Sequence, residues 1–323
     1  MIKELIKRLF DASVHMPHIS EYDVFVKKSV LDELINRQNW HSLFELYLSC
    51  SEADRHFLLV SMYEHDGRSL FQQLPQLFPQ NYVAHLMLGA YLTGKALHLR
   101  RNCIASHIED QTWEEIFIIS ERATQALLRA IEINAYDPQI YFPLIQVQTI
   151  DNEKRDGMTS YINAVTSSTK HHYPLYVLVL TFLTKKWGGS YEEMFSFAKH
   201  HSGSENAEPC MQGLIALAHI ERWLGYAFDE EYELQKQYFE DEFIQQELHT
   251  SYSLFRKNAK QNGFYRTAAN QFAFAFYVSG QNDLLKDALL FLNGHYFTRP
   301  WCYGSAGEAE VLSDALKRVG LNY

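Results

Sequence analysis

A histidine followed two positions later by a glutamate is the nearest approach to a metal-binding pattern in this sequence. The pattern His-Ile-Glu occurs twice, at residues 107–109 and 219–221. In zinc sites built on such a pair, a Pro-Cys-x-x-Cys run supplies further ligands downstream. Here the only Pro-Cys pair ends at Cys210, upstream of His219, and lacks the second cysteine. Because zinc needs three or four ligands in a defined geometry, the sequence predicts no metal site.

The most concentrated charge lies in residues 229–247, called here the acidic segment. It holds eight acidic residues and one lysine, a net charge of −7, with four aromatic residues between them. One interpretation is a solvated outer face whose aromatics turn to the core. The other is a surface that captures a basic protein, where charge speeds association and buried rings supply affinity. The candidate binding residues are Asp229, Glu230, Glu231, Tyr232, Glu233, Tyr238, Glu240, Asp241 and Glu242, together with Trp187 outside the segment.

Other catalytic and cofactor motifs are missing. The sequence holds no Gly-rich dinucleotide fingerprint, no phosphate-binding P-loop and no nucleophile elbow. A small basic cluster of Lys95, His98, Arg100 and Arg101 favours a helix C-terminus over a phosphate site. The net charge of −10 disfavours nucleic acid and suits a basic protein partner. The sequence therefore predicts no catalytic residue, no cofactor and no nucleic-acid partner.

Cysteine usage and hydropathy bear on the cellular compartment. The four cysteines, at residues 50, 103, 210 and 302, form no Cys-x-x-Cys pair and are typical of reduced core residues. The most apolar run, residues 174–183, is shorter than the roughly 20 residues that a membrane span needs. The charged N-terminus lacks the apolar stretch of a secretion signal. We therefore expect a cytoplasmic protein with no membrane partner.

Helical periodicity predicts an all-α fold. Val26, Val30 and Leu34 recur every four residues, with Leu31 and Ile35 beside them, and together they form one buried stripe. Residues 284–292 repeat the pattern near the other end. With 15 glycines and 8 prolines in 323 residues, the chain has too few turn formers for a sandwich or barrel of short strands. Residues 229–260 hold neither Gly nor Pro, which predicts one long helix or a closely joined pair.

Capping patterns place several helix ends. A Ser or Thr followed three positions later by an acid satisfies free backbone N–H groups at a helix start. The pattern occurs at Ser51/Asp54, Thr112/Glu115, Ser190/Glu193 and Ser305/Glu308, and Asp137-Pro138 marks a further start. Gly188-Gly189 and Gly280 lie where helix ends favour a left-handed residue.

The expected architecture is a set of stacked antiparallel helical hairpins, because short stops separate helices of similar length. Polar linkers divide the chain into an N-terminal helical segment (1–80), a central set of hairpins (81–200) and C-terminal hairpins (201–323). A further break at residues 151–157 predicts a loop between helices. Two arrangements stay open: one continuous α-solenoid, or two packed helical lobes.

Small and apolar residues recur at matching positions in two neighbouring segments. They are Ala84, Leu88 and Gly89, followed by Ala123, Leu127 and Ala130. Residues 81–145 thereby resemble a tetratricopeptide hairpin, and residues 264–293 resemble the same unit more loosely. The resemblance implies closely packed helices with Leu127 filling the gap between them. The family unit has 34 residues, whereas about 18 extra residues (roughly 95–112) separate the two helices here.

Residues 187–190 form a distinctive Trp-Gly-Gly-Ser turn. Together with its neighbours over residues 186–194, this turn resembles a segment of uncharacterised bacterial helical-repeat proteins, in which it joins the two helices of a hairpin. The resemblance implies a fold and a bacterial origin. A structural role also accounts for these residues without any ligand. Trp187 covers a helix end, the glycines turn the chain, and Ser190 with Glu193 caps the next helix. A binding role for Trp187 is the alternative.

These observations favour protein binding without catalysis. Stacked hairpins create an extended concave surface of the kind that holds another protein. A narrower hypothesis is a bacterial immunity protein that neutralises a basic toxin, in line with the acidic charge, the missing catalytic motifs and the bacterial resemblance. The alternative from another class is a small-molecule sensor or enzyme with a pocket between helical lobes.

Overall fold

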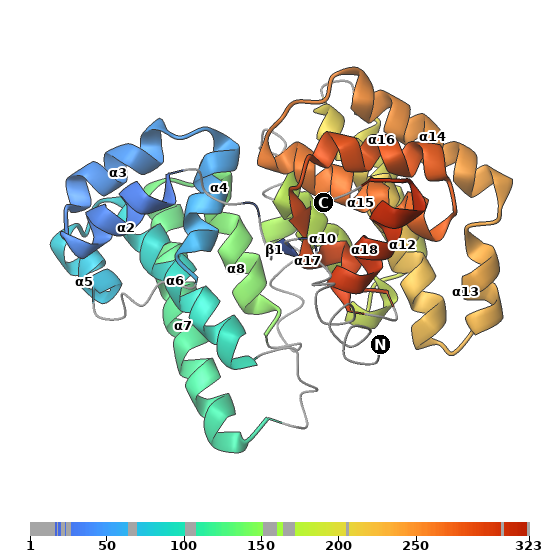
Figure 1. Ribbon diagram of the computed structural model, residues 1–323. Helices are drawn as coiled ribbons and strands as arrows, with labels where there is room; N and C mark the ends of the chain where they lie inside the picture. The colour runs from blue at the N-terminus through green and yellow to red at the C-terminus, as the bar shows by residue number, and fades with distance from the viewer. Residues whose placement is uncertain are drawn as a thin grey trace, which may run out of the picture.

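The computed structural model of the chain is built almost entirely from helices (Figure 1). It describes residues 17, 19–20, 23, 27–63, 70–100, 108–150, 160–163, 172–204, 207–304 and 307–321. Within these ranges the predicted all-α class is confirmed, since strand is limited to β1 (Ile19–Ser20) and β2 (Tyr296–Phe297). Figure 1 shows the helices gathered into two lobes that lie side by side.

The N-terminal lobe is formed by the first half of the chain. Its helices are α2 (Lys28–Asn36), α3 (Trp40–Ser49), α4 (Glu52–Ser61), α5 (Leu70–Leu77), α6 (Tyr82–Arg100), α7 (Asp110–Ile133), the 3₁₀ helix η2 (Pro138–Ile140) and α8 (Tyr141–Gln148). In α2 the predicted buried stripe is confirmed at Leu31 and Ile35 and was wrong at Val30, which is 43% exposed; Val26 lies outside the described residues. Successive helical positions point about 100° apart, so only one of two adjacent apolar stripes faces the core.

The C-terminal lobe is formed by the second half. Its helices are α10 (Tyr173–Phe182), η4 (Lys185–Trp187), α11 (Tyr191–Ser202), η5 (Pro209–Gln212), α12 (Gly213–Phe228), α13 (Tyr232–Tyr238), α14 (Glu242–Lys257), α15 (Gly263–Val278), α16 (Asn282–Leu292), α17 (Thr298–Trp301) and α18 (Glu308–Arg318). Residues 229–260 form the closely joined pair α13 and α14, one of the two predicted forms. Helix α15 is central, since it packs against α4, α10, α12, α16 and α17.

The beginning of the chain is tied to the C-terminal lobe. Strand β1 pairs in parallel with β2, which joins residues far apart in the sequence. Next to this pair, Arg266 of α15 donates to Asp23 at 3.0 Å. The Asn270 side chain accepts from Trp301 Nε1 at 3.0 Å and donates to the His295 carbonyl at 3.0 Å. Because Asn270 is fully buried, these bonds satisfy polar groups that would otherwise destabilise the core.

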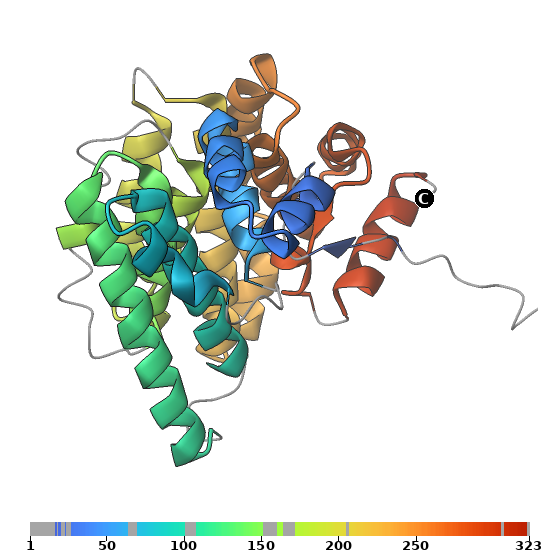
Figure 2. The same cartoon turned by 90° about the vertical axis from the view of Figure 1, so that its left-hand side faces the viewer.

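Helices α6 and α7 form an antiparallel pair and are the longest in the described part of the chain (Figure 1). Gly89 of α6 faces Leu127 of α7, and a Cβ at position 89 would overlap the Leu127 side chain. The predicted close packing is confirmed, whereas the repeat arrangement stays a prediction. The expected separation of roughly 95–112 was too long, because α6 continues to Arg100 and α7 begins at Asp110. Figure 2 shows that α7 extends beyond the rest of the molecule.

The two lobes meet at a cluster of buried rings. The ring centroid of His56 in α4 lies 4.6 Å from that of Phe142 in α8 and 5.2 Å from that of His172 before α10. The ring of Phe264 in α15 closes the cluster, 5.1 Å from His172. Burial lowers the pKa of both histidines, and that of His172 falls to about 3. Both rings are therefore neutral at pH 7. Packing of these rings and a hydrogen bond between His172 and Gln139 join the lobes.

Several predicted helix starts are confirmed. The Ser51 hydroxyl accepts from the Asp54 N–H at 3.2 Å, and the Ser190 hydroxyl accepts from the Glu193 N–H at 3.1 Å. The Asp137 side chain caps η2 by accepting a hydrogen bond from the Gln139 N–H at 3.0 Å. These caps satisfy backbone donors that have no partner inside the helix.

Two other predicted ends need comment. The start at Thr112 was wrong, because α7 already begins at Asp110 and Thr112 lies inside the first turn. An acid at the start of a helix is favoured by the helix dipole even without a side-chain cap. Ser305 lies outside the described residues, and α18 begins at Glu308. Gly280 has φ of +70°, as predicted for a helix end.

Helices pack across both expected segment boundaries. Helices α4 and α5 contact α6 across residue 80, and α10 and α11 contact α12 across residue 200. One apolar core extends from Leu31 to Val319 and thus through both lobes. The predicted break at 151–157 lies outside the described residues. The three-segment division stays a prediction about the sequence, while packing joins the segments on either side of each boundary.

Cysteine placement corrects part of the core prediction. Cys210 is buried and Cys50 partly buried, whereas Cys302 is exposed, and Cys103 lies outside the described residues. Their wide spacing in sequence therefore did not establish burial. Among the described helices, none combines the length and the hydropathy that crossing a membrane would require.

Candidate functional site

The Trp-Gly-Gly-Ser turn is a sharp reversal between α10 and α11. Gly188 has φ of +79°, a left-handed conformation that glycine adopts without strain. The prediction that Gly189 also needs a left-handed conformation was wrong: a Cβ there would collide with the Leu183 carbonyl, so close approach is what requires glycine. Trp187 packs edge-to-face on Phe182 with ring centroids 5.2 Å apart. Its predicted cover of the helix end is confirmed, and its binding role stays a prediction.

Two lysines beside the turn reach across to α12. Lys185 donates to Asp229 at 2.8 Å, and Lys186 donates to Glu221 at 3.0 Å. The hydrogen bond to Asp229 raises the pKa of Lys185, so the lysine stays charged. The fold thus joins the turn to the first residue of the acidic segment, two features that are 44 residues apart in the chain.

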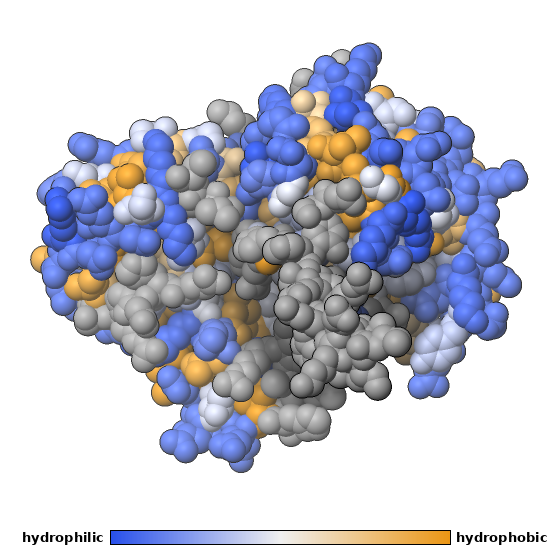
Figure 3. Space-filling model, viewed as in Figure 1, coloured by the Kyte–Doolittle hydropathy of each residue, from blue (hydrophilic) through white to orange (hydrophobic). Residues whose placement is uncertain are grey.

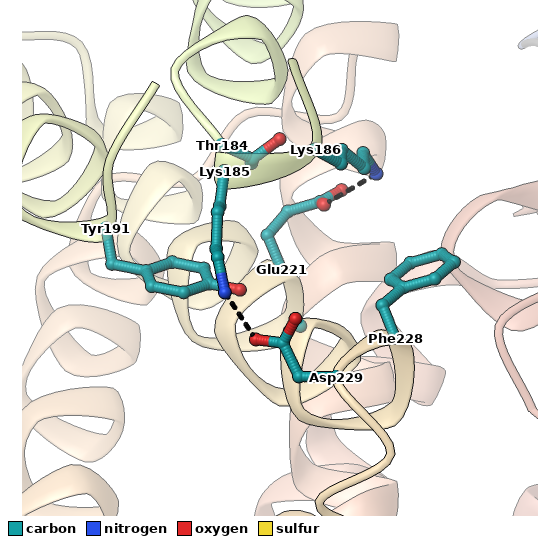
Figure 4. Close-up of a pocket in the computed structure, with 8 residues that line it drawn as sticks. Thr184, Lys185, Lys186, Tyr191, Glu221, Phe228 and Asp229 are labelled. Atoms are coloured by element: carbon teal, nitrogen blue, oxygen red, sulfur yellow. Dashed lines mark hydrogen bonds and ion pairs between the residues drawn. The ribbon is translucent and has the colours of Figure 1, made fainter. Parts of the chain in front are cut away.

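A pocket of about 250 Å³ lies between η4, α11 and α12 (Figure 4). Its lining residues are Thr184, Lys185, Lys186, Tyr191, Glu221, Gly225, Phe228 and Asp229. Figure 4 shows Tyr191 and the Lys185–Asp229 pair on one side, Phe228 on the other and Glu221 behind them. All of these residues belong to the C-terminal lobe, so this pocket is not the one that was expected between lobes.

Glu221 places a buried negative charge in the pocket wall. Its side chain is only 1% exposed, and within the described part of the chain it forms an ion pair with Lys186. Its Oε1 accepts no hydrogen bond from any described residue, although the Tyr303 hydroxyl lies close to this carboxylate. Burial first, and then the charge of Glu221, raises the pKa of Tyr303. A buried carboxylate with an oxygen that accepts no bond favours cations nearby.

Aromatic rings and an arginine surround the same pocket. The Arg222 guanidinium carbon lies 4.2 Å from the ring centroid of Tyr191 and 3.8 Å from that of Tyr226. Phe228, at the end of α12, is 69% exposed. Lys186 Nζ lies 5.9 Å from its ring centroid. The chain therefore already holds cations against the rings of this region.

The acidic segment continues from the pocket along the edge of the C-terminal lobe. Figure 3 shows a predominantly hydrophilic surface where Figure 1 places α13. All seven acidic candidates are exposed. Glu233 pairs with Lys236 at 2.8 Å, and Asp241 caps α14 by accepting from the Phe243 N–H at 2.8 Å. Five of the seven form no ion pair with any described residue: Glu230, Glu231, Glu240, Asp241 and Glu242.

The aromatics of the acidic segment divide between core and solvent. Phe239 is buried, whereas Tyr232 is 56% and Phe243 is 73% exposed. Leu234, which was not among the predicted binding residues, is 48% exposed. Both sequence interpretations therefore describe part of the segment, because α13 has a 3.6-residue period and turns successive side chains to different faces. An alternation of burial along so short a helix could not be read from composition.

Tyr238 faces inward and is part of a buried clamp. Its hydroxyl lies 2.8 Å from His219 Nδ1, and the other ring nitrogen of His219 lies 2.9 Å from Glu247. Glu247 also accepts from Lys199 at 3.0 Å. The hydrogen bond from His219 is the largest cause that lowers the pKa of Glu247 to about 2. The clamp links α11, α12, α13 and α14 and thereby fixes the acidic segment on the lobe.

The structure separates the two ends of the second His-Ile-Glu motif. His219 reaches α13 and α14, whereas Glu221 reaches η4, because residues two apart on a helix point in different directions. Within the described ranges, no group of three or more His, Cys, Asp or Glu side chains is arranged to hold a metal ion. The basic cluster lies in part at the end of α6, where His98 and Arg100 occupy the last turn and Arg101 is outside the described residues.

Comparison with protein-family models, with curated proteins and with solved structures found no match to this chain.

Proposed function

We propose that this protein binds a basic protein partner through the surface formed by the acidic segment, and that it does so without catalysis. The observation that carries the proposal is the mixture of exposed groups there. Tyr232, Leu234 and Phe243 lie exposed in the segment. Of its seven acidic candidates, only Asp229 and Glu233 form an ion pair with a described residue. A solvated outer face needs no exposed rings, whereas a docking surface uses rings for affinity and charge for rate.

The support from electrostatics is local. The acidic segment contributes −7 of a total net charge of −10. A concentration of one sign attracts an oppositely charged protein over about 8–10 Å at physiological salt. The clamp at His219 and the cap at Asp241 hold the segment in one conformation. A rigid surface loses less conformational entropy when it binds.

A bacterial immunity protein is the narrower form of this proposal. An acidic surface with exposed rings is suited to covering a basic toxin. The resemblance of the Trp-Gly-Gly-Ser turn to a segment of bacterial helical-repeat proteins agrees with a bacterial origin. Finding the gene next to one for a basic toxin would support this form, and finding it in a metabolic operon would count against it.

The first experiment reverses the unpaired charges. Glu230, Glu240 and Glu242 are replaced together by Lys, and Asp241 is kept because its side chain caps α14. We expect unchanged helicity by circular dichroism and loss of the partner in a pull-down. After the partner is identified, its association rate should fall about tenfold or more at low salt.

The matched control moves the same charge elsewhere. Glu45, Glu114 and Glu310 are exposed acids outside the segment, and their replacement by Lys gives the same change in net charge. The control should recover the partner like the wild-type protein. If both triple variants lose the partner equally, net charge alone decides binding. If both keep it, the acidic segment is not the binding surface.

A further inference from the structure

The pocket beside the acidic segment has the chemistry of a cation site. Two carboxylates, Glu221 and Asp229, line it together with the rings of Tyr191 and Phe228 (Figure 4). Planar cations bind in such surroundings because carboxylates accept their hydrogen bonds and aromatic faces attract their charge. The volume of about 250 Å³ is enough for one long side chain and too small for a folded segment.

The cation that now occupies the mouth of the pocket is weakly held. Lys185 is 60% exposed and Asp229 is 35% exposed, and one 2.8 Å contact joins them. Exposed lysine–carboxylate pairs of this kind contribute little to stability, because water and salt screen them. A guanidinium can make two parallel hydrogen bonds to one carboxylate, which an ammonium group cannot. An incoming arginine can therefore displace Lys185 from Asp229.

Two observations distinguish the pocket from a simple acidic cluster. The first is Glu221, whose side chain is 1% exposed and whose Oε1 accepts no hydrogen bond from any described residue. Lys186 balances the charge of Glu221 and Lys185 balances that of Asp229, so an arginine that replaces Lys185 leaves the charge of the pocket unchanged. The second is Arg222, whose guanidinium lies between the rings of Tyr191 and Tyr226. Arg222 and Tyr226 do not line the pocket, but the Tyr191 ring does, and it already stacks with a guanidinium from within the chain.

We propose that this pocket receives an arginine side chain of the basic partner, which pairs with Asp229, stacks on Phe228 and displaces Lys185. The inference rests on the proposed function, since it supplies the anchor for a partner that the acidic segment attracts. Phe228 is suited to this role because it is 69% exposed and directly precedes Asp229. Lys185 competes with the incoming side chain for Asp229. An arginine displaces it because a guanidinium can form two hydrogen bonds to the carboxylate, whereas a lysine can form only the kind of contact that Lys185 already makes.

The test uses a small probe and so does not depend on finding the partner. Nα-acetyl-arginine amide is titrated into the full chain and followed by calorimetry, with the citrulline and lysine derivatives as comparisons. Asp229→Asn should weaken binding of the arginine probe at least about tenfold, because a charged hydrogen-bonding group is lost. Lys185→Met should strengthen binding about two- to fivefold, because the competitor is removed.

Lys236→Met is the matched control for Lys185→Met. It removes one positive charge from the same surface, but Lys236 pairs with Glu233 and does not line the pocket. It should leave probe affinity within about twofold of wild type, since exposed charges are screened by salt. Folding of every variant is checked by urea denaturation. Because Lys185 is 60% and Asp229 is 35% exposed, we expect both variants to fold.

Three results would overturn the inference. One is an arginine probe that binds no better than the citrulline probe. Another is weaker binding in Lys185→Met, which would show that the lysine serves the ligand. The third is binding of inorganic phosphate that is lost in Lys185→Met, which would make this an anion site. If the arginine probe binds as expected while charge reversal of the acidic segment leaves partner capture intact, the pocket stands and the proposed docking surface fails.

Discussion

Lowering the pH from 7 to 4.5 is expected to remove about 3 kcal/mol of folding free energy through His172 alone. This ring is fully buried, and burial lowers its pKa to about 3. Its Nδ1 accepts from the Leu175 N–H at 3.3 Å, so Nε2 carries the proton and donates to Gln139 at 3.1 Å. Protonation of Nδ1 would break the cap of α10 and place a charge among the rings of His56 and Phe264.

The sign and size follow from proton binding in the two states. Between pH 6.5 and 3 the unfolded chain binds a proton at residue 172 and the folded chain does not, so stability rises with pH. The full contribution is present above pH 6.5 and is lost as the pH falls toward 3. At pH 4.5 the unfolded histidine is about 2 pH units below its pKa, and each unit corresponds to about 1.4 kcal/mol.

The variant His172→Asn tests this assignment. Asparagine keeps an acceptor for the helix cap and does not titrate in this range. Urea unfolding at pH 7 and pH 4.5 should show a loss of free energy that is about 3 kcal/mol smaller in the variant than in wild type. Groups such as Glu247 contribute equally to both proteins and cancel in the difference.

The control replaces an exposed histidine. His249→Asn, on the outer face of α14, should keep the wild-type loss. If His172→Asn loses as much stability as wild type over this range, the acid sensitivity lies elsewhere and the account of the lobe junction is wrong.

Two further predictions concern glycines held by close packing. Gly89→Ala should lower the free energy of unfolding by about 1–3 kcal/mol, because the added Cβ would overlap Leu127. In a double-mutant cycle, Leu127→Ala should relieve part of that loss. If the two losses simply add, the contact between the residues is contradicted. Gly189→Ala should lower it by about 1–3 kcal/mol because the Cβ would collide with the Leu183 carbonyl. An unchanged midpoint in urea would show that the turn can open.

Much of the helical content is readable from the sequence because it depends on near neighbours. The apolar pattern of residues 284–292 correctly marks the buried face of α16, where Leu285, Leu289 and Leu292 are in the core. The cap at Ser190 involves residues only three apart. The error at Val30 arose where two adjacent stripes were equally apolar, and only the position of the neighbouring helices selects between them.

The candidate site is less predictable, because its parts come from distant segments. The acidic segment and the Trp-Gly-Gly-Ser turn are each visible in the sequence. Their junction through Lys185 and Asp229 is not, since side-chain contacts between separate helices leave no local pattern. The same holds for Glu221, which in sequence belongs to a His-Ile-Glu motif and in the fold lines a pocket.

The sequence by itself determined that the chain forms helices, where several of them begin, and that its charge is concentrated in one segment. These properties follow from periodicity, capping and composition, which act over a few residues. Only the tertiary structure decided that His56 and His172 meet between the lobes, that Phe243 is exposed while Phe239 is buried, and that two lysines close a pocket on α12. Burial and electrostatic pairing depend on which surfaces approach one another, and that is decided by the packing of the whole chain.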